Sequence, residues 1–162
     1  MSSFINTLDE NMRRHITAIK EPALNEFVVR ALDEYGSVDK LEEGNDVADV
    51  MMAMLKKRKQ VHEGEPLQVW IEVMIAAALL HNLFYEGTVT SLFAAREKLT
   101  PLAKECKVHT NAYYSIFQAI ECQLGDDTPI ESCRPVPSTP NEIFAWACWF
   151  VEELHGCKEI PA

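Results

Sequence analysis

The residues best suited to chemistry in this chain are a histidine and an asparagine side by side, His81 and Asn82. They follow the most apolar stretch of the sequence, WIEVMIAAALL, which runs from residue 70 to residue 80. An imidazole fixed at the end of a buried segment is a candidate metal ligand. The alternative is a structural histidine, hydrogen-bonded to the backbone or to a polar neighbour.

Motifs of nucleophilic and phosphate-binding enzymes are missing from the sequence. It contains no GxSxG, no phosphate-binding glycine loop and no HExxH. Ser115 lies beside Tyr113 and Tyr114, but nothing in the sequence links it to a histidine and an acid. We therefore predict no nucleophile. The remaining candidate functional residues are histidines, cysteines and carboxylates.

The elements that must position these residues are all predicted to be helices, because apolar residues recur at helical spacing and no segment sustains strand alternation. Residues 37–44 and 126–138 are expected to be polar loops. The expected helices run from Phe4 to Ile19, from Pro22 to Gly36, from Asn45 or Asp46 to Leu55, from residue 66 to residue 83, from Thr90 to Leu99, from Pro101 to Cys106, from Thr110 or Asn111 to Leu124, and from Thr139 to about Leu154.

The helix expected over residues 66–83 is predicted to be the centre of the domain. A helix that is apolar on nearly all sides is buried on most of its faces. Its three consecutive alanines allow neighbouring helices to approach closely. We expect one all-α domain over residues 1–162, with an N-terminal helix in residues 1–20 and a core in residues 21–155.

Composition limits the classes of partner. The net charge of −10 argues against a broad surface for nucleic acid or anionic membranes, and it suits a basic partner or, equally, simple solubility. The apolar stretch is too short to span a bilayer, so we expect no membrane partner. Five cysteines without a CxxC favour a reducing compartment, and the first residues do not resemble a signal peptide. These features predict a cytoplasmic protein.

Once the helices are placed, four segments resemble the HD-domain superfamily. IAAALLHN is similar to the family signature AALLHD, in which a helix presents a His-Asp pair to metal. VHTNAYYSIFQAIECQLGD is similar to a later helix that carries another histidine, and STPNEIFAWACWFVEEL to the closing segment that carries the last aspartate. EPALNEFVVRALDEYG resembles the helix before the core in some bacterial and phage HD proteins. Together these segments cover most of residues 20–155.

The resemblance implies a single compact HD-like bundle and, for typical members, metal-dependent hydrolysis of phosphoesters such as nucleotides. Bound divalent ions polarise the phosphate and lower the pKa of an attacking water. This sequence departs from the family at most ligand positions. His81 is retained and His109 matches an accessory histidine, but the aspartate position holds Asn82, the later histidine position holds Gln123, the last aspartate position holds Cys148, and the first histidine position holds Asp49 or Val50.

Two interpretations follow from these departures. We favour a degenerate HD-fold protein that binds a nucleotide or a protein partner and holds no metal at full occupancy. The alternative is an active metal-dependent phosphohydrolase with ligands rearranged around His81, His109 and Asp49. The pocket candidates are His81, Asn82, His109, Glu121, Gln123 and Cys148, and the candidate metal ligands are His81, His109, Asp49 and Cys148.

The identity of any metal depends on which of these ligands meet. Zn, Mn, Fe, Ni and Mg are the candidate ions. Zinc is favoured if His81 and Cys148 meet with Cys122 or His109, since zinc takes imidazole and thiolate. The alternative is that Cys122 and Cys148 are small buried residues of apolar helices. The location is the host cytoplasm if the gene is of phage origin.

Overall fold

The computed structural model is helical throughout the parts of the chain that it describes, which are residues 4–57, 67–83 and 89–124 and positions 143, 144, 147, 148 and 151. For helix residues 56, 57, 67–70, 89–92 and 121–124 only the backbone is described. The predicted all-α class is confirmed. The elements are η1 (Phe4–Thr7), α1 (Arg14–Ala18), α2 (Pro22–Tyr35), α3 (Val38–Lys57), α4 (Leu67–Leu80), α5 (Val89–Cys106) and α6 (Thr110–Leu124).

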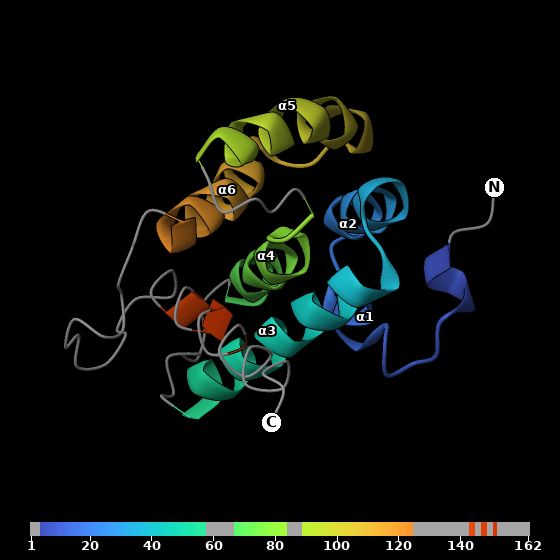
Figure 1. Ribbon diagram of the computed structural model, residues 1–162, viewed down its shortest axis with the longest axis vertical. Helices are drawn as coiled ribbons and strands as arrows, with labels where there is room; N and C mark the ends of the chain where they lie inside the picture. Colours follow the sequence, from blue (N-terminus) through green and yellow to red (C-terminus); the bar gives the residue numbers. More distant parts are fainter. Residues whose placement is uncertain are drawn as a thin grey trace, which may run out of the picture.

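Helix α4 lies at the centre of the bundle, as predicted. Helices α2, α3 and α6 pack directly against it, while α5 packs on α2 and α6 (Figure 1). Every residue from Ile71 to Leu80 is buried. The predicted end at residue 83 is wrong, because the helix stops at Leu80 and residues 81–83 form a turn in which Leu83 N–H donates to Leu80 O at 3.3 Å. His81 and Asn82 therefore lie on that turn.

Helices α3 and α4 are in closest contact at a glycine. A Cβ atom added to Gly44 would lie 3.0 Å from the Cα of Leu79 and 3.1 Å from the carbonyl oxygen of Ala78. Both neighbouring atoms belong to the backbone of α4, so no change of side-chain rotamer can relieve the contact. The alanines of α4 are fully buried. Small residues on both helices thus bring the two backbones together, as the alanine run predicted for α4.

The bounds of α2 agree with the prediction because strong signals mark both ends. Pro22 occupies the first turn, where a missing N–H costs nothing. The side chain of Glu21 caps this turn by accepting a hydrogen bond from Leu24 N–H at 2.7 Å. At the other end, Gly36 N–H donates to Leu32 O at 2.8 Å. The predicted inner face, Leu24, Phe27, Val28 and Leu32, is buried.

The continuous helix predicted from Phe4 to Ile19 is wrong. The structure divides this segment into η1 and α1, joined by a turn. Asp9 accounts for the break, since its carboxylate accepts a hydrogen bond from Met12 N–H at 2.9 Å. A short acidic side chain that bonds nearby backbone competes with helix continuation.

The loop predicted for residues 37–44 is also wrong, because α3 already begins at Val38. Ser37 starts the helix, and its hydroxyl accepts a hydrogen bond from Lys40 N–H at 3.3 Å. Asp39 and Glu42 of this segment are exposed, Lys40 and Glu43 are half-buried, and Leu41 and Gly44 are buried. Asn45, predicted as a cap, lies inside the helix and is fully buried.

The predicted break before Pro101 is wrong, since α5 continues through it from Val89 to Cys106. A proline inside a helix removes one backbone hydrogen bond. The neighbouring turn gains side-chain bonds instead. Thr100 Oγ1 donates to Arg96 O at 2.5 Å, and the Tyr113 hydroxyl donates to the same oxygen at 3.2 Å. Packing against α2 and α6 holds the helix together across the proline.

The last two predicted helices agree with the described residues. Helix α6 spans Thr110–Leu124, as expected. Positions 143, 144, 147, 148 and 151 are helical and buried, with the spacing of one helix face. The predicted caps at Thr139 and Glu142 lie outside the described residues. Within the described part of the chain, no helix has the length and apolar character needed to cross a membrane.

Candidate functional site

His81 is held by its own helix and by the C-terminal segment. Its Nδ1 lies 2.6 Å from the carbonyl oxygen of Ala78, one turn earlier in α4. A carbonyl oxygen only accepts, so Nδ1 carries the proton and donates it. The imidazole ring also meets the ring of Phe144 edge to face, with 6.1 Å between ring centroids. The hydrogen bond to the backbone that the structural alternative expects is therefore present.

The next residue joins α4 to α3. Asn82 is 4% exposed, and its Nδ2 donates to Glu43 Oε2 at 2.8 Å and to Lys40 O at 3.3 Å. The ammonium of Lys40 donates in turn to Leu83 O at 2.6 Å. The turn after α4 is thus fixed to α3 by three hydrogen bonds. Glu43 and Lys40 were missed by the sequence analysis, which placed them in a loop.

Two acceptor atoms of this turn accept no hydrogen bond from the residues that the structure describes. Because Nδ1 of His81 carries the proton, Nε2 of the neutral ring is an acceptor. Burial lowers the pKa of His81, and the bond to Ala78 O and the charge of Glu43 oppose this only in part, so the ring is neutral at pH 7. The Oδ1 atom of Asn82 is buried and has no hydrogen-bond partner among the residues that the structure describes. We call His81, Asn82 and Glu43 the α4 turn cluster.

A divalent ion fits this cluster poorly. The cluster offers one imidazole nitrogen, one carboxylate and one neutral amide oxygen, and that carboxylate already accepts the amide of Asn82. Protein sites for transition metals usually have three or more imidazole, thiolate or carboxylate ligands. Among the residues that the structure describes, no group of three or more histidine, cysteine, aspartate or glutamate side chains is placed to hold a metal ion.

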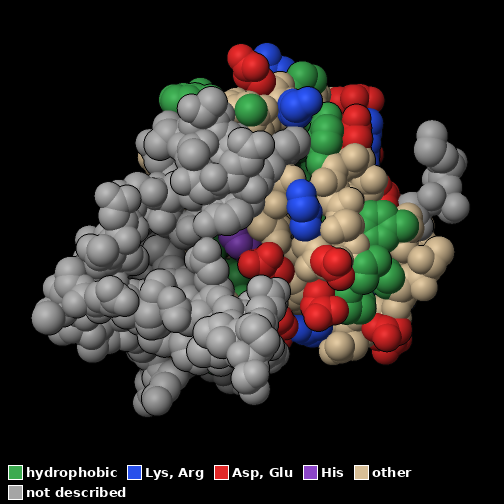
Figure 2. Space-filling model, viewed as in Figure 1, with side chains coloured by type: hydrophobic (Ala, Val, Ile, Leu, Met, Phe, Trp, Pro, Cys, Tyr) green, Lys and Arg blue, Asp and Glu red, His purple; other side chains and the backbone are tan. Residues whose placement is uncertain are grey.

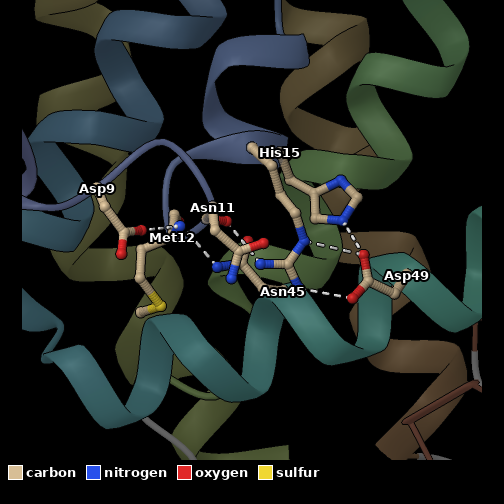
Figure 3. Close-up of polar contacts among 7 residues, drawn as sticks. Asp9, Asn11, Met12, His15, Asn45 and Asp49 are labelled. Carbon is tan, nitrogen blue, oxygen red and sulfur yellow. Dashed lines mark hydrogen bonds and ion pairs between the residues drawn. The ribbon is translucent and has the colours of Figure 1, made fainter.

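Asp49, a candidate metal ligand, belongs to a second polar cluster, between α1 and α3. Arg14 Nε and Nη2 donate to its two carboxylate oxygens at 3.1 Å and 2.6 Å. His15 Nε2 lies 2.6 Å from Oδ1, and Figure 3 shows the ring of His15 pointing toward the carboxylate of Asp49. In the same region the amide of Asn45 donates to Met12 O at 2.8 Å. These contacts fix the N-terminal segment on α3.

The charges of this second cluster stabilise one another. Burial raises the pKa of Asp49, but the hydrogen bonds from Arg14 and His15 outweigh it and hold the pKa below its ordinary value. The bond to Asp49 likewise raises the pKa of Arg14 against the effect of burial. Asp49 is therefore ionised and paired at neutral pH.

Two other candidates, His109 and Cys148, have described side chains. His109 is exposed just before α6, where its Nδ1 accepts a hydrogen bond from Asn111 N–H at 3.1 Å. Cys148 is a buried thiol one helical turn after Phe144, as its structural alternative predicted. The side chains of Glu121 and Gln123, and that of Cys122, lie outside the described residues. Whether they reach the α4 turn cluster stays a prediction.

Glu72 is a further polar residue that the sequence analysis did not single out. It is 2% exposed in the middle of α4, and its Oε1 accepts hydrogen bonds from Lys20 N–H at 2.9 Å and Glu21 N–H at 2.8 Å. These two groups precede the first turn of α2. A single carboxylate inside the apolar run WIEVMIAAALL was the signal that could have identified it.

The surface beside the α4 turn cluster is acidic. Figure 2 shows acidic side chains gathered over α3 on the viewed face. The acidic residues of α3 that reach this surface fully or partly are Asp39, Glu42, Glu43, Asp46 and Asp49. Such a surface repels anions, including free phosphoesters, and attracts basic groups.

Comparison of the chain with protein-family models, with curated proteins and with solved structures found no match. The resemblance to HD domains, with the activity that it implies, stays a prediction.

Proposed function

We propose that this chain is a ligand-binding or protein-interaction module with an HD-like helical arrangement, and that it does not hydrolyse phosphoesters. The observation that carries this proposal is the engagement of Asn82. At the position where the family would place a metal-binding aspartate, the amide donates to Glu43 and to Lys40 O. The residue links two helices and brings no charge with which to bind a divalent ion.

Two further contacts support the same proposal. His81 uses Nδ1 to cap the end of α4 and its ring to pack on Phe144. Asp49 forms an ion pair with Arg14 and a hydrogen bond with His15, so its carboxylate already has partners without a metal. His81, Asn82 and Asp49 thus each have contacts that stabilise the fold.

The acidic surface over α3 favours a basic protein partner over a free nucleotide. Besides the paired Asp49, four acidic side chains of α3 reach the surface, and they raise the local concentration of cationic groups and speed their association. We further propose that the chain acts in the cytoplasm, in agreement with its cysteine pattern.

Metal analysis and hydrolysis assays test the proposal together. Protein purified without chelator should contain well below one equivalent of Mn, Fe, Ni and Zn. It should release no phosphate from nucleotides or phosphodiesters above the level of His81→Gln, with added Mg or Mn. Stoichiometric metal, or metal-dependent turnover that His81→Gln removes, would overturn it.

A second candidate, a phosphohydrolase with rearranged ligands, is favoured by one observation. The buried Oδ1 of Asn82 and the Nε2 of His81 both keep a lone pair beside the carboxylate of Glu43. This candidate predicts metal-stimulated phosphate release that His81→Ala abolishes while circular dichroism shows an intact fold. Equal activity in His81→Ala and in the wild type would refute it.

A further inference from the structure

Helix α5 carries an exposed stripe with an acidic residue and a basic residue placed to exchange when the helix is reversed. Phe93, Glu97, Pro101 and Lys104 are all exposed, and their spacing of four, four and three residues places them on one helix face. Phe93 is 58% exposed. Neither Glu97 nor Lys104 forms an ion pair with the residues that the structure describes.

The order of charges on this stripe decides which partner fits. Suppose that two copies of α5 pack antiparallel about a two-fold axis between residues 100 and 101. Residue 97 of each copy then faces residue 104 of the other, because these two residues lie equally far from the axis on opposite sides. Glu97 then meets the Lys104 of the second copy, and the pair occurs twice. Phe93 falls on the end of the opposite helix, near Lys107 and Val108. A two-fold interface requires this kind of self-complementarity.

The distribution of charge over the chain also favours an interface at α5 rather than elsewhere on the surface. With a net charge of −10, two copies repel over most of their surfaces. Over residues 93–107, four basic residues (Arg96, Lys98, Lys104 and Lys107) outnumber two acidic ones (Glu97 and Glu105). Both copies of α5 carry a small net positive charge, so they repel each other less there than through the acidic face over α3.

An aromatic and arginine surface extends the stripe onto α6. The guanidinium carbon of Arg96 lies 6.0 Å from the ring centroids of both Tyr114 and Phe117. Tyr114 is 52% exposed. Phenylalanine, tyrosine and arginine are enriched where protein surfaces associate. We propose that the α5 face, defined by Phe93, Glu97, Pro101 and Lys104 with Arg96 and Tyr114, is the interface of an antiparallel homodimer.

Sedimentation velocity of the full chain over a wide concentration range tests this interface. The wild type dimerises with rising concentration, and Glu97→Lys and Lys104→Glu each weaken dimerisation about tenfold or more, because each places like charges opposite each other twice. An equimolar mixture of the two variants restores a dimer, since every opposed pair is then of opposite sign. Glu42→Lys, a charge reversal on exposed α3, is the control that leaves dimerisation unweakened.

Three results overturn the proposal. A wild type that is monomeric at every concentration assigns the face to a different protein. Dimerisation that survives both single charge reversals places the interface elsewhere. A mixture that stays monomeric refutes the antiparallel pairing. Circular dichroism confirms the fold of each variant, and Phe93→Ser, which must also weaken the dimer, serves if a charge reversal fails to fold.

Discussion

The buried carboxylate of Glu72 should be one of the largest single polar contributions to stability in this protein. It accepts two backbone hydrogen bonds, from Lys20 and Glu21, where the chain enters α2. Hydrogen bonds to a charged group contribute about 1.5–3 kcal/mol each, so the pair contributes about 3–6 kcal/mol. Glu72→Met keeps a similar volume and gains about 1.5–3 kcal/mol from apolar burial. The difference between the middles of these two ranges gives an expected net loss of about 2 kcal/mol.

Urea unfolding followed by circular dichroism measures this loss, and hydrogen exchange locates it. The amides of Lys20 and Glu21 should lose protection in Glu72→Met, while amides in the middle of α6 should follow only the global change in stability. Glu72→Gln is the matched control, because its carbonyl oxygen can still accept both bonds, and it should lose less than half as much. Buried ionic groups can sometimes be replaced by apolar ones without loss. Glu72→Met as stable as the wild type, with unchanged protection at both amides, would refute the reasoning.

Three other substitutions test the helix contact and the two polar clusters. Gly44→Ala should destabilise the protein by up to about 2 kcal/mol in urea unfolding, since overpacking against backbone costs about 1–3 kcal/mol and better helix propensity returns about 1 kcal/mol. Ala53→Gly, exposed on the same helix, measures the propensity term alone, and a stabilised Gly44→Ala would contradict the contact. Asp49→Asn should lower stability at neutral pH and weaken the acid sensitivity below about pH 4. A carboxyl whose folded pKa lies below its ordinary value of 3.8 stabilises the fold above that value and loses this effect as the pH falls through the folded pKa. Stability curves that run parallel to the wild type at low pH would count against this ion pair. His81→Gln should reduce the loss of stability below pH 6.5, because burial lowers the folded pKa and the unfolded chain takes up the proton first. An unchanged slope between pH 6.5 and pH 5 would show that His81 is not the group responsible.

The sequence predicted helices well where local signals and hydrophobic spacing agreed. Pro22 and Gly36 mark the ends of α2, and the apolar run of α4 predicted its burial. The predicted helix bounds were wrong where contacts with other helices override the local sequence signal. Charged residues hid the start of α3, because they cover the outer face of a helix whose inner face includes a glycine. Pro101 was expected to end a helix that tertiary packing keeps intact.

The site was harder to predict because its contacts join distant parts of the chain. The sequence identified His81 and gave its bond to backbone as an alternative, since that bond spans three residues. The partner of Asn82 lies 39 residues away on α3, and the partners of Glu72 lie 51 and 52 residues away. No local pattern encodes these pairs. They follow from the packing of α3 and α2 on α4.

The burial of α4 on every face has a consequence for the synthesis of the protein. Residues 71–80 leave the ribosome before α6 and before Phe144, yet they need both as neighbours. Until the chain has grown past those residues, its most apolar segment stays exposed to water. Such a segment is a binding site for chaperones and a point of aggregation. Production of the protein should therefore depend on chaperone supply, and C-terminal truncation should yield insoluble chains.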